Sequence, residues 1–381
     1  MIPRTLFETE HEQFRDSVSK FLEAEAVPYH HQWEKDGQID RALWQKAGAM
    51  GFLAPGTAEN LGGLGLDFRY NAILDEETAR RGLSGIGFGL HSDITVPYLL
   101  NIGNQAQLEK YIPGCLSGDI ITAIAMTEPG TGSDLQSIKT TAIRDGDDYV
   151  INGSKTFITN GQLADLVIVV CKTDPSAGAA GTSLLLVEAG TPGFEKGKNL
   201  EKLGLKAQDT SELFFNDVRV PKENLLGEEG KGFIYLMQEL PQERLSIAIG
   251  CTAGMESVLA GTVDYVQERQ AFGQPIASFQ NTQFKLAELD AEVTAMRVFV
   301  DRCIELHVAG KLDTVTASKA KLLSSELMNR VADECLQLHG GYGYMWEYPV
   351  ARAYADSRIN RIYGGTNEIM KLIIARKLLQ S

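Results

Sequence analysis

Residues 152–161 read NGSKTFITNG, a short run of β-branched, aromatic and hydroxyl residues between two Asn-Gly pairs. Asn-Gly favours the tight turns that join neighbouring strands, so this run predicts a strand with a turn at each end. Apolar runs follow at residues 166–171 and 183–187, and residues 213–220 alternate in polarity before Pro221. Together these stretches predict a β domain over residues 120–230.

The sequence before this domain has helical spacing. Thr9 and Glu12 match the T-x-x-E capping box, and apolar residues then recur every three or four positions until Pro28. Similar patterns continue through the first 119 residues. We therefore expect residues 1–119 to form an all-helical domain.

Helical spacing also returns after the β domain. Long helical stretches lie at residues 245–267, 280–309 and 314–338, and shorter ones at residues 349–360 and 366–380. Long neighbouring helices with short links favour an antiparallel bundle, so a four-helix bundle is expected over residues 231–381. The predicted chain is thus α+β, with a middle β-barrel or sandwich between two helical domains.

The composition excludes several classes of protein. The chain has 381 residues, with 36 Lys and Arg against 50 Asp and Glu, so its net charge of −14 disfavours nucleic-acid binding. The sequence contains no run of about 18 apolar residues, so no membrane span is expected. The five cysteines form no CxxC pair and no Cys/His cluster has zinc spacing, which indicates free thiols and no metal site.

These free thiols point to a reducing compartment. Glu8, Glu10 and Glu12 make the amino end too acidic for a transit peptide. We expect a cytoplasmic protein, or one of the mitochondrial matrix if a presequence has been removed.

The common nucleotide-binding motifs are missing. The chain contains no G-x-G-x-x-G and no complete P-loop, which disfavours a nicotinamide-binding Rossmann domain and a P-loop nucleotidase. Residues 127–134 read TEPGTGSD, and such a glycine-rich turn can hold a phosphate or a polar heterocycle closely. A plain solvated turn explains the same residues. Likewise FITNG at residues 157–161 is by itself only a hairpin.

Two polar sites near helix ends allow similar alternatives. Glu243 and Arg244 follow Pro241, and this order is typical of a helix start, but it also suits a general base beside an anion-binding arginine. Residues 363–368, YGGTNE, join two helices with Thr366 as a plausible N-cap. That helix start could also receive an anion or a carbonyl oxygen.

Taken in order along the chain, these strings resemble the acyl-CoA dehydrogenase flavoprotein family. The resemblance extends over essentially the whole sequence and rests on MTEPGTGSD (126–134), FITNG (157–161), LFFNDVRVP (213–221), RQAFGQPI (269–276), QLHGG (337–341) and IYGGTNEI (362–369). LPQERL (240–245) and GYMWEYP (343–349) look most like the long-chain members. The resemblance implies FAD bound between the β domain and the C-terminal bundle.

The resemblance also implies which residues bind FAD and substrate. The residues expected around the isoalloxazine ring are Met126, Thr127, Gly132, Ser133, Phe157, Ile158 and Thr159. The residues expected to reach the FAD of a neighbouring subunit are Arg269, Phe272, Gln280, Gln337, Gly340 and Gly341. The residues expected at the pyrophosphate or adenosine part are Thr366, Asn367 and Glu368. The residues expected at the acyl-CoA are Ser133, Pro241, Arg244, Gly364 and Gly365. A site shared between chains implies a homo-oligomer, in this family usually a dimer of dimers.

The chain departs from many family members at the catalytic position. Those members have a glutamate in Y-E-G-T, where this chain has Gly364. In long-chain and isovaleryl-type members the base lies instead after P-Q, which corresponds to Glu243. Gly364 would keep its N–H as a donor to the thioester oxygen. A second departure, Phe157 in place of a tryptophan, still provides an aromatic ring for the flavin face.

The resemblance thus implies an acyl-CoA dehydrogenase. Glu243 would remove a proton from the carbon beside the thioester, hydride would leave the β carbon for flavin N5, and an electron-transferring flavoprotein would reoxidise the flavin. The substrate would be a medium-to-long or methyl-branched acyl-CoA. Two alternatives stay open: an oxygen-using acyl-CoA oxidase or nitroalkane oxidase of the same fold, and a non-catalytic protein that binds flavin or a partner.

Overall fold

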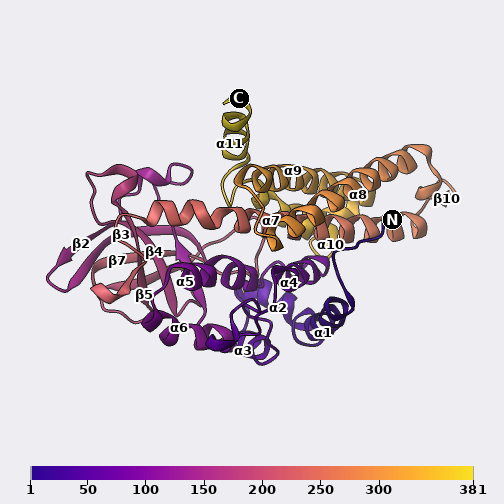
Figure 1. The fold of residues 1–381 in the computed structure, drawn as a ribbon. Coiled ribbons are helices and arrows are strands. Elements are labelled where there is room, and N and C mark those ends of the chain that lie inside the picture. Colours follow the sequence, from indigo (N-terminus) through magenta and orange to yellow (C-terminus); the bar gives the residue numbers. More distant parts are fainter. Residues whose placement is uncertain (1, 381) are drawn as a thin grey trace.

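The computed structural model describes residues 2–380, which form a helical region, a β sheet and a second helical region in that order (Figure 1). The first region consists of α1 (Thr9–Glu25), α2 (Val27–Asp36), α3 (Arg41–Ala49), α4 (Phe68–Arg80), α5 (Val96–Ile102) and α6 (Gln105–Ser117). A π-helical turn at Leu90–Thr95 leads directly into α5. The all-helical prediction for this part of the chain is confirmed.

The start of α1 differs in detail from the prediction. Glu8, not Thr9, is the N-cap, and its backbone N–H donates to the ring of His11 at 3.2 Å. The predicted capping box of Thr9 and Glu12 is therefore wrong by one residue. Pro28 lies in the first turn of α2, where its missing N–H leaves no hydrogen bond unmade.

The middle region is one eight-stranded sheet. Its strands are β1 (Thr122–Ala125), β2 (Thr141–Asp145), β3 (Asp148–Thr159), β4 (Leu166–Lys172), β5 (Thr182–Glu188), β6 (Phe194–Asn199), β7 (Thr210–Pro221) and β8 (Leu225–Leu226). The order across the sheet is β6-β7-β3-β2-β4-β5-β8, and β1 pairs in parallel with β4. The sheet ends at β6 and β8. Side chains of β3 and β7 pack with those of β4 and β5 in one core, which agrees with the predicted β domain.

One expected turn in this sheet is wrong. Asn152 and Gly153 lie inside β3, where the register with β7 shifts between Ile151 and Gly153. Gly153 has φ +151°, and a Cβ there would lie 2.4 Å from Oγ1 of Thr140. The pair thus forms a β-bulge, which, like the predicted tight turn, favours glycine. The other pair does end β3, because Asn160 follows its last residue.

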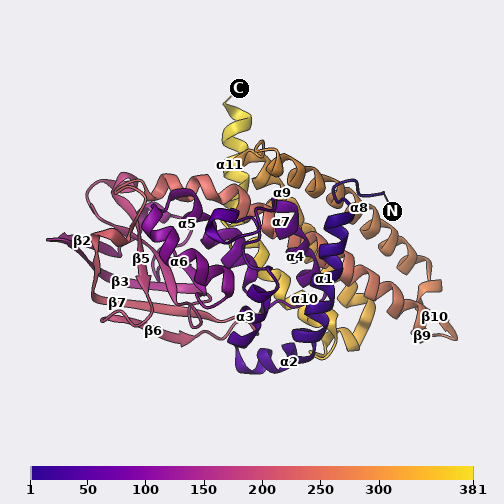
Figure 2. The ribbon, with the colours of Figure 1, turned by 60° about the horizontal axis from the view of Figure 1, so that its bottom comes forward.

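Both faces of β4 are buried, in agreement with its continuous apolar sequence. Leu166, Ile168 and Val170 belong to a core shared with side chains of α5 and α6. Val167 and Val169 belong to a second core within the β region. Figure 2 shows α5 and α6 beside the sheet, so the first helical region closes one of its faces.

The last region contains α7 (Gly232–Glu268), α8 (Gln280–Val308), α9 (Thr314–His339), α10 (Pro349–Ser357) and α11 (Asn367–Leu379). A small hairpin, β9 (Gln270–Ala271) with β10 (Gln274–Pro275), joins α7 to α8. Helices α7 to α10 contribute to one apolar core, and α11 projects from the body (Figure 1).

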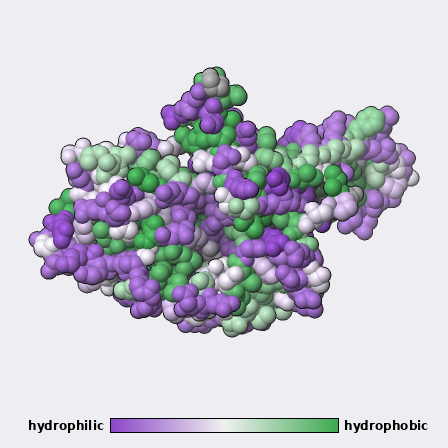
Figure 3. All heavy atoms as spheres, in the orientation of Figure 1, coloured by the Kyte–Doolittle hydropathy of each residue, from purple (hydrophilic) through white to green (hydrophobic). Residues whose placement is uncertain are grey.

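Helix α7 is longer than the sequence predicts. It begins at Gly232, so Pro241 lies inside it rather than at its start. Of the helices in residues 2–380, α7 is the one long and apolar enough to cross a membrane by length and composition. It packs against α4, α8 and α9, which is the position of a core helix. The face in Figure 3 is mostly polar, with apolar residues in scattered groups.

Candidate active site

Glu243 lies on the buried side of α7. Its side chain is 5 % exposed, and Oε1 accepts a hydrogen bond from the hydroxyl of Tyr98 at 3.0 Å. Burial raises the pKa of Glu243 to about 7, although the Tyr98 hydroxyl and the charge of Arg244 oppose the shift. A carboxylate that titrates near neutrality can accept a proton and release it again, as a general base must.

The next residue, Arg244, points toward the loop between α10 and α11. Its Nε donates to the carbonyl of Gly364 at 3.4 Å, and its Nη1 donates to Oγ of Ser318 at 3.3 Å. Both partners are neutral, and burial lowers the pKa of the guanidinium. The side chain of Arg244 therefore contacts the loop that is predicted to supply the N–H donor. The predicted contact of Arg244 with substrate stays a prediction.

Gly364 and Gly365 form this loop. Their φ values are +63° and +90°, which glycine adopts without strain. A Cβ at Gly364 would lie 2.5 Å from Cδ1 of Ile247, so the Ile247 side chain would have to shift before the glutamate of other family members could be placed there. Within residues 2–380 neither glycine N–H donates a hydrogen bond. Two backbone donors thus remain free for a ligand.

The glycine-rich turn after β1 is fixed to β3. Nζ of Lys155 donates at 2.9 Å both to the carbonyl of Met126 and to Oε1 of Glu128, and this ion pair is buried. The N–H of Thr156 also donates to the carbonyl of Thr127 at 2.9 Å. The structure thereby brings together the two predicted flavin segments, 126–133 and 157–159.

Phe157 is unusual for an aromatic residue. It is 66 % exposed and has φ +60°, at a point where β3 and β7 lose register. Ile158 beside it is buried, whereas Thr159 is partly exposed. A strained backbone that turns a large ring outward is typical of a ligand-binding position.

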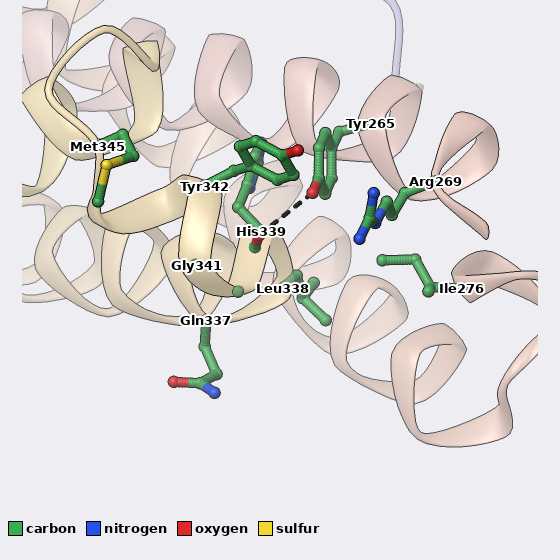
Figure 4. A pocket seen from close by; sticks show the side chains of 10 residues that line it. Tyr265, Arg269, Ile276, Gln337, Leu338, His339, Gly341, Tyr342 and Met345 are labelled. Atoms are coloured by element: carbon green, nitrogen blue, oxygen red, sulfur yellow. Dashed lines mark hydrogen bonds between the residues drawn. The ribbon is translucent and has the colours of Figure 1, made fainter. Parts of the chain in front are cut away.

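The residues predicted to reach a neighbour's FAD lie at the far end of α7. Arg269, Gln337, Gly340 and Gly341 line a pocket of about 450 Å³ (Figure 4). The Tyr265 hydroxyl donates to the carbonyl of His339 at 3.2 Å and fixes one wall. Figure 4 shows the Gln337 side chain pointing away from Tyr265 and Arg269.

The two other residues of that predicted set are at the surface. Phe272 is 96 % exposed at the tip of the β9–β10 hairpin, and Gln280 is exposed at the start of α8. Arg269 and Glu243 lie 26 positions apart, which corresponds to about 39 Å along a helix at roughly 1.5 Å per residue. The structure does not bring the pocket and Glu243 together within one chain.

The three residues predicted to bind the pyrophosphate or adenosine part of FAD lie in different environments. Thr366 is the N-cap of α11, as expected, and its Oγ1 accepts from the N–H of Ile369 at 3.4 Å. Glu368 is exposed. Asn367 is buried, and its amide bonds Lys321, Ser325 and Glu326. The Asn367 side chain thus stabilises the loop from within.

Comparison with known families decides what this arrangement belongs to. Models of the N-terminal, middle and C-terminal domains of acyl-CoA dehydrogenase match residues 8–119, 123–218 and 230–379. The chain belongs to the acyl-CoA dehydrogenase family. Members of this family are oxidoreductases that use FAD to dehydrogenate a CH–CH bond of acyl-CoA.

Individual relatives are similar over nearly the whole chain. The mitochondrial long-chain specific acyl-CoA dehydrogenase of Rattus norvegicus is 54 % identical over 99 % of this chain and 88 % of its own length. The crystal structure of acyl-CoA dehydrogenase from Geobacillus kaustophilus is 53 % identical, with a TM-score of 0.97 over 99 % of this chain and 100 % of that one. An acyl-CoA dehydrogenase complexed with FAD from Bacillus anthracis is 35 % identical, with a TM-score of 0.92 over 98 % of this chain and 68 % of that one.

The glycines test whether the family's FAD fits this chain. Gly132, Gly130 and Gly341 have no positive φ, and a Cβ on any of them would meet no atom of the chain within 4 Å. Neither backbone conformation nor packing within the chain therefore requires glycine there. A ligand lying against these backbones would account for the glycines, and the open space beside them is compatible with a bound FAD.

Sequence reasoning missed two residues of the site. Tyr98 lies in α5, far from Glu243 in sequence, and Lys321 lies in α9, where its Nζ donates to the carbonyl of Gly365 at 2.8 Å. Neither belongs to a recognisable string. A polar residue at a helical position that should be apolar is the signal that could have indicated them.

Proposed function

We propose that this chain is an FAD-dependent dehydrogenase of medium-to-long or methyl-branched acyl-CoA, with Glu243 as its base. The observation that supports this proposal is a buried carboxylate with a pKa near 7, next in sequence to the arginine that contacts a loop with two free N–H groups. The similarity to long-chain relatives favours long acyl chains.

Glu243 acts as its anion. Its carboxylate takes a proton from the carbon next to the thioester carbonyl, and the electrons left behind move onto the carbonyl oxygen. The free N–H of Gly364 donates to that oxygen and stabilises its charge. Because Glu243 is buried, an acyl chain that fills the site excludes water from this step.

Met126, Thr127, Gly132, Ser133 and residues 157–159 would hold the flavin ring, with Ser133 also touching the acyl-CoA. When bound, FAD accepts the hydride that leaves the β carbon. The exposed ring of Phe157 covers one side of that space. Lys155 keeps the turn and the strand in register by its bonds to Met126 and Glu128.

The pocket at the far end of α7 supports an oligomer. About 39 Å of helix separates Arg269 from Glu243, which is longer than an extended FAD molecule. The pocket would therefore serve the FAD of a second chain, in a homotetramer arranged as a dimer of dimers. Electrons would leave to an electron-transferring flavoprotein in the cytoplasm or the mitochondrial matrix.

Anaerobic flavin reduction across straight and methyl-branched acyl-CoAs tests the proposal. Bleaching of the flavin by medium-to-long or branched substrates is the expected result. Prompt peroxide formation in air, without an added acceptor, would identify an oxygen-using enzyme instead. A colourless protein that takes up no FAD would contradict catalysis altogether.

A further inference from the structure

Two buried cations meet at the Gly364–Gly365 loop. Lys321 has no exposed surface, and its Nζ donates to the carbonyl of Gly365 at 2.8 Å and to Oδ1 of Asn367 at 2.9 Å. Arg244 is 3 % exposed and donates to the carbonyl of Gly364. Each cation therefore holds one carbonyl of the glycine pair.

Neither cation pairs with a carboxylate in the part of the chain that the structure describes. The hydrogen-bond partners of Arg244 are a carbonyl and a hydroxyl, and those of Lys321 are a carbonyl and an amide. Burial lowers the pKa of Lys321 to about 8. The charge of Glu243 acts on Arg244, and those of Glu326 and Glu368 act on Lys321, only at longer range than an ion pair. A buried charge without a direct ion pair disfavours folding, so stability alone does not explain these two residues.

The loop itself needs an external constraint. Two consecutive glycines have no side chains to pack and can adopt many backbone conformations. Anchoring both carbonyls fixes the planes of the peptide groups that follow Gly364 and Gly365. The N–H groups of the two glycines then remain free, as described above. A cation on a carbonyl also polarises the peptide group that contains it, so Arg244 strengthens the N–H of Gly365 as a donor and Lys321 strengthens the N–H of Thr366.

We propose that Arg244 and Lys321 are positioning residues that hold the Gly364–Gly365 loop with its N–H groups toward the thioester oxygen. This inference rests on the proposed function. It assigns Arg244 to the loop rather than to an anion of the substrate. The two positive charges also lie on the side of the site where the negative charge of the enolate develops, and they stabilise it at longer range.

The test uses the holoenzyme and the β-thia analogue of dodecanoyl-CoA, which can lose its α proton but has sulfur where the hydride would leave. Exchange of the α proton with solvent deuterium, followed against pH, reports enolate stabilisation without flavin reduction. Lys321→Met is the main variant. Lys196→Met is its control, since Lys196 also donates to two backbone carbonyls, those of Gln162 and Ala164, but lies on the edge strand β6.

In Lys321→Met we expect the pH midpoint of exchange to rise by about one unit. Flavin reduction by dodecanoyl-CoA should slow by roughly ten- to a hundredfold, while KM changes by less than about threefold. Lys196→Met should match the wild type in both measurements. If Lys321→Met does not fold, Arg244→Lys provides the same comparison, with a shorter side chain that cannot reach both partners.

An unchanged exchange midpoint in a folded Lys321→Met enzyme would overturn the positioning role and leave the proposed function intact. A wild-type enzyme that neither exchanges the α proton nor bleaches its flavin would instead refute the proposed function, and this inference with it. A lower melting temperature with an unchanged midpoint identifies a purely structural lysine and also contradicts the proposal.

Discussion

The hydroxyl of Tyr98 on α5 donates a hydrogen bond of 3.0 Å to Oε1 of Glu243 on α7, and both side chains are buried. The bond joins the first helical region to the last one at the candidate base. It fixes one carboxylate oxygen and leaves the other free to face a substrate. It also favours the ionised form of Glu243 against the effect of burial.

The first prediction concerns the pH dependence of the wild type. Glu243 must be ionised to accept a proton, and burial raises its pKa to about 7. The rate of anaerobic flavin reduction should therefore be low below pH 6 and rise with pH through about 7. Stopped-flow absorbance of the flavin at saturating acyl-CoA measures it. A flat profile between pH 6 and 8 would assign the proton transfer to another group.

Replacing Tyr98 by phenylalanine removes the hydroxyl and keeps the ring. Since that hydroxyl lowers the pKa of Glu243, the variant should titrate at a higher pH than the wild type. If the pKa of Glu243 rises by about one unit, less of it is ionised at pH 7, and flavin reduction there should be several-fold slower. The rate should recover at pH 9. A rate that stays low at every pH would mean that Tyr98 acts through packing instead.

The Glu243→Gln variant retains size and hydrogen bonding but has no base. FAD should remain bound, while flavin reduction should fall by about two to four orders of magnitude. Glu239→Gln is the matched control, because Glu239 lies one turn earlier on α7 and its carboxylate accepts from Asn101 at 2.9 Å. Near wild-type bleaching by Glu243→Gln would exclude this residue as the base.

Gly132→Ala tests the cofactor cradle. A Cβ at Gly132 meets no atom of the chain within 4 Å, so the stability of the apoprotein should change by less than about 0.5 kcal/mol. FAD binding should weaken by about 1–3 kcal/mol, since the methyl occupies ligand space. Gly261→Ala on exposed α7 surface should leave FAD affinity unchanged. Titration with FAD and urea unfolding of the apoprotein give the two quantities.

Glu76 offers a stability prediction away from the site. Burial alone would raise its pKa, but Arg297, Arg4 and Arg15 contact its two oxygens and lower the pKa to about 2. Glu76→Gln should lower the free energy of unfolding at pH 7 by about 3–5 kcal/mol in urea melts. Glu12→Gln, which removes an exposed partner of Arg15, should cost less than about 1 kcal/mol.

The sign of this effect follows from the pKa. The folded value of about 2 lies below the ordinary glutamate value of 4.5, so the contribution of Glu76 is present at neutral pH. It is lost as the pH falls through about 2. The stabilities of the wild type and Glu76→Gln should therefore converge in strong acid; a constant difference down to pH 2 would contradict the pairing.

The sequence predicts elements well where a pattern is long. Helices α8 and α9 end within one residue of the expected bounds, because apolar spacing over 29 and 26 residues defines them. Asn152-Gly153 misleads because its turn preference is local, whereas pairing of β3 with β7 continues through it. Pro241 misleads similarly, since a proline inside a helix is tolerated when packing on both sides continues the helix.

The site was predictable only in part. Strings of adjacent residues indicated Glu243, the turn at Gly132 and the Gly364 loop. Tyr98 contacts Glu243 because α5 packs against α7, and Lys321 contacts Gly365 because α9 packs against α11. Contacts between helices far apart in the sequence cannot be predicted from a local pattern. The free N–H groups of the glycine pair likewise depend on which carbonyls the rest of the fold anchors.

If the site is shared between chains as proposed, the length of helix α7 predicts complementation between two inactive variants. On that proposal, each chain would give its Glu243 end to one reaction centre and its Arg269 end to another. Two inactive proteins, one damaged at Glu243 and one damaged at the pocket, would therefore complement each other when co-expressed. Half of the centres in a mixed dimer would combine both defects, and the other half would combine two intact ends and recover activity.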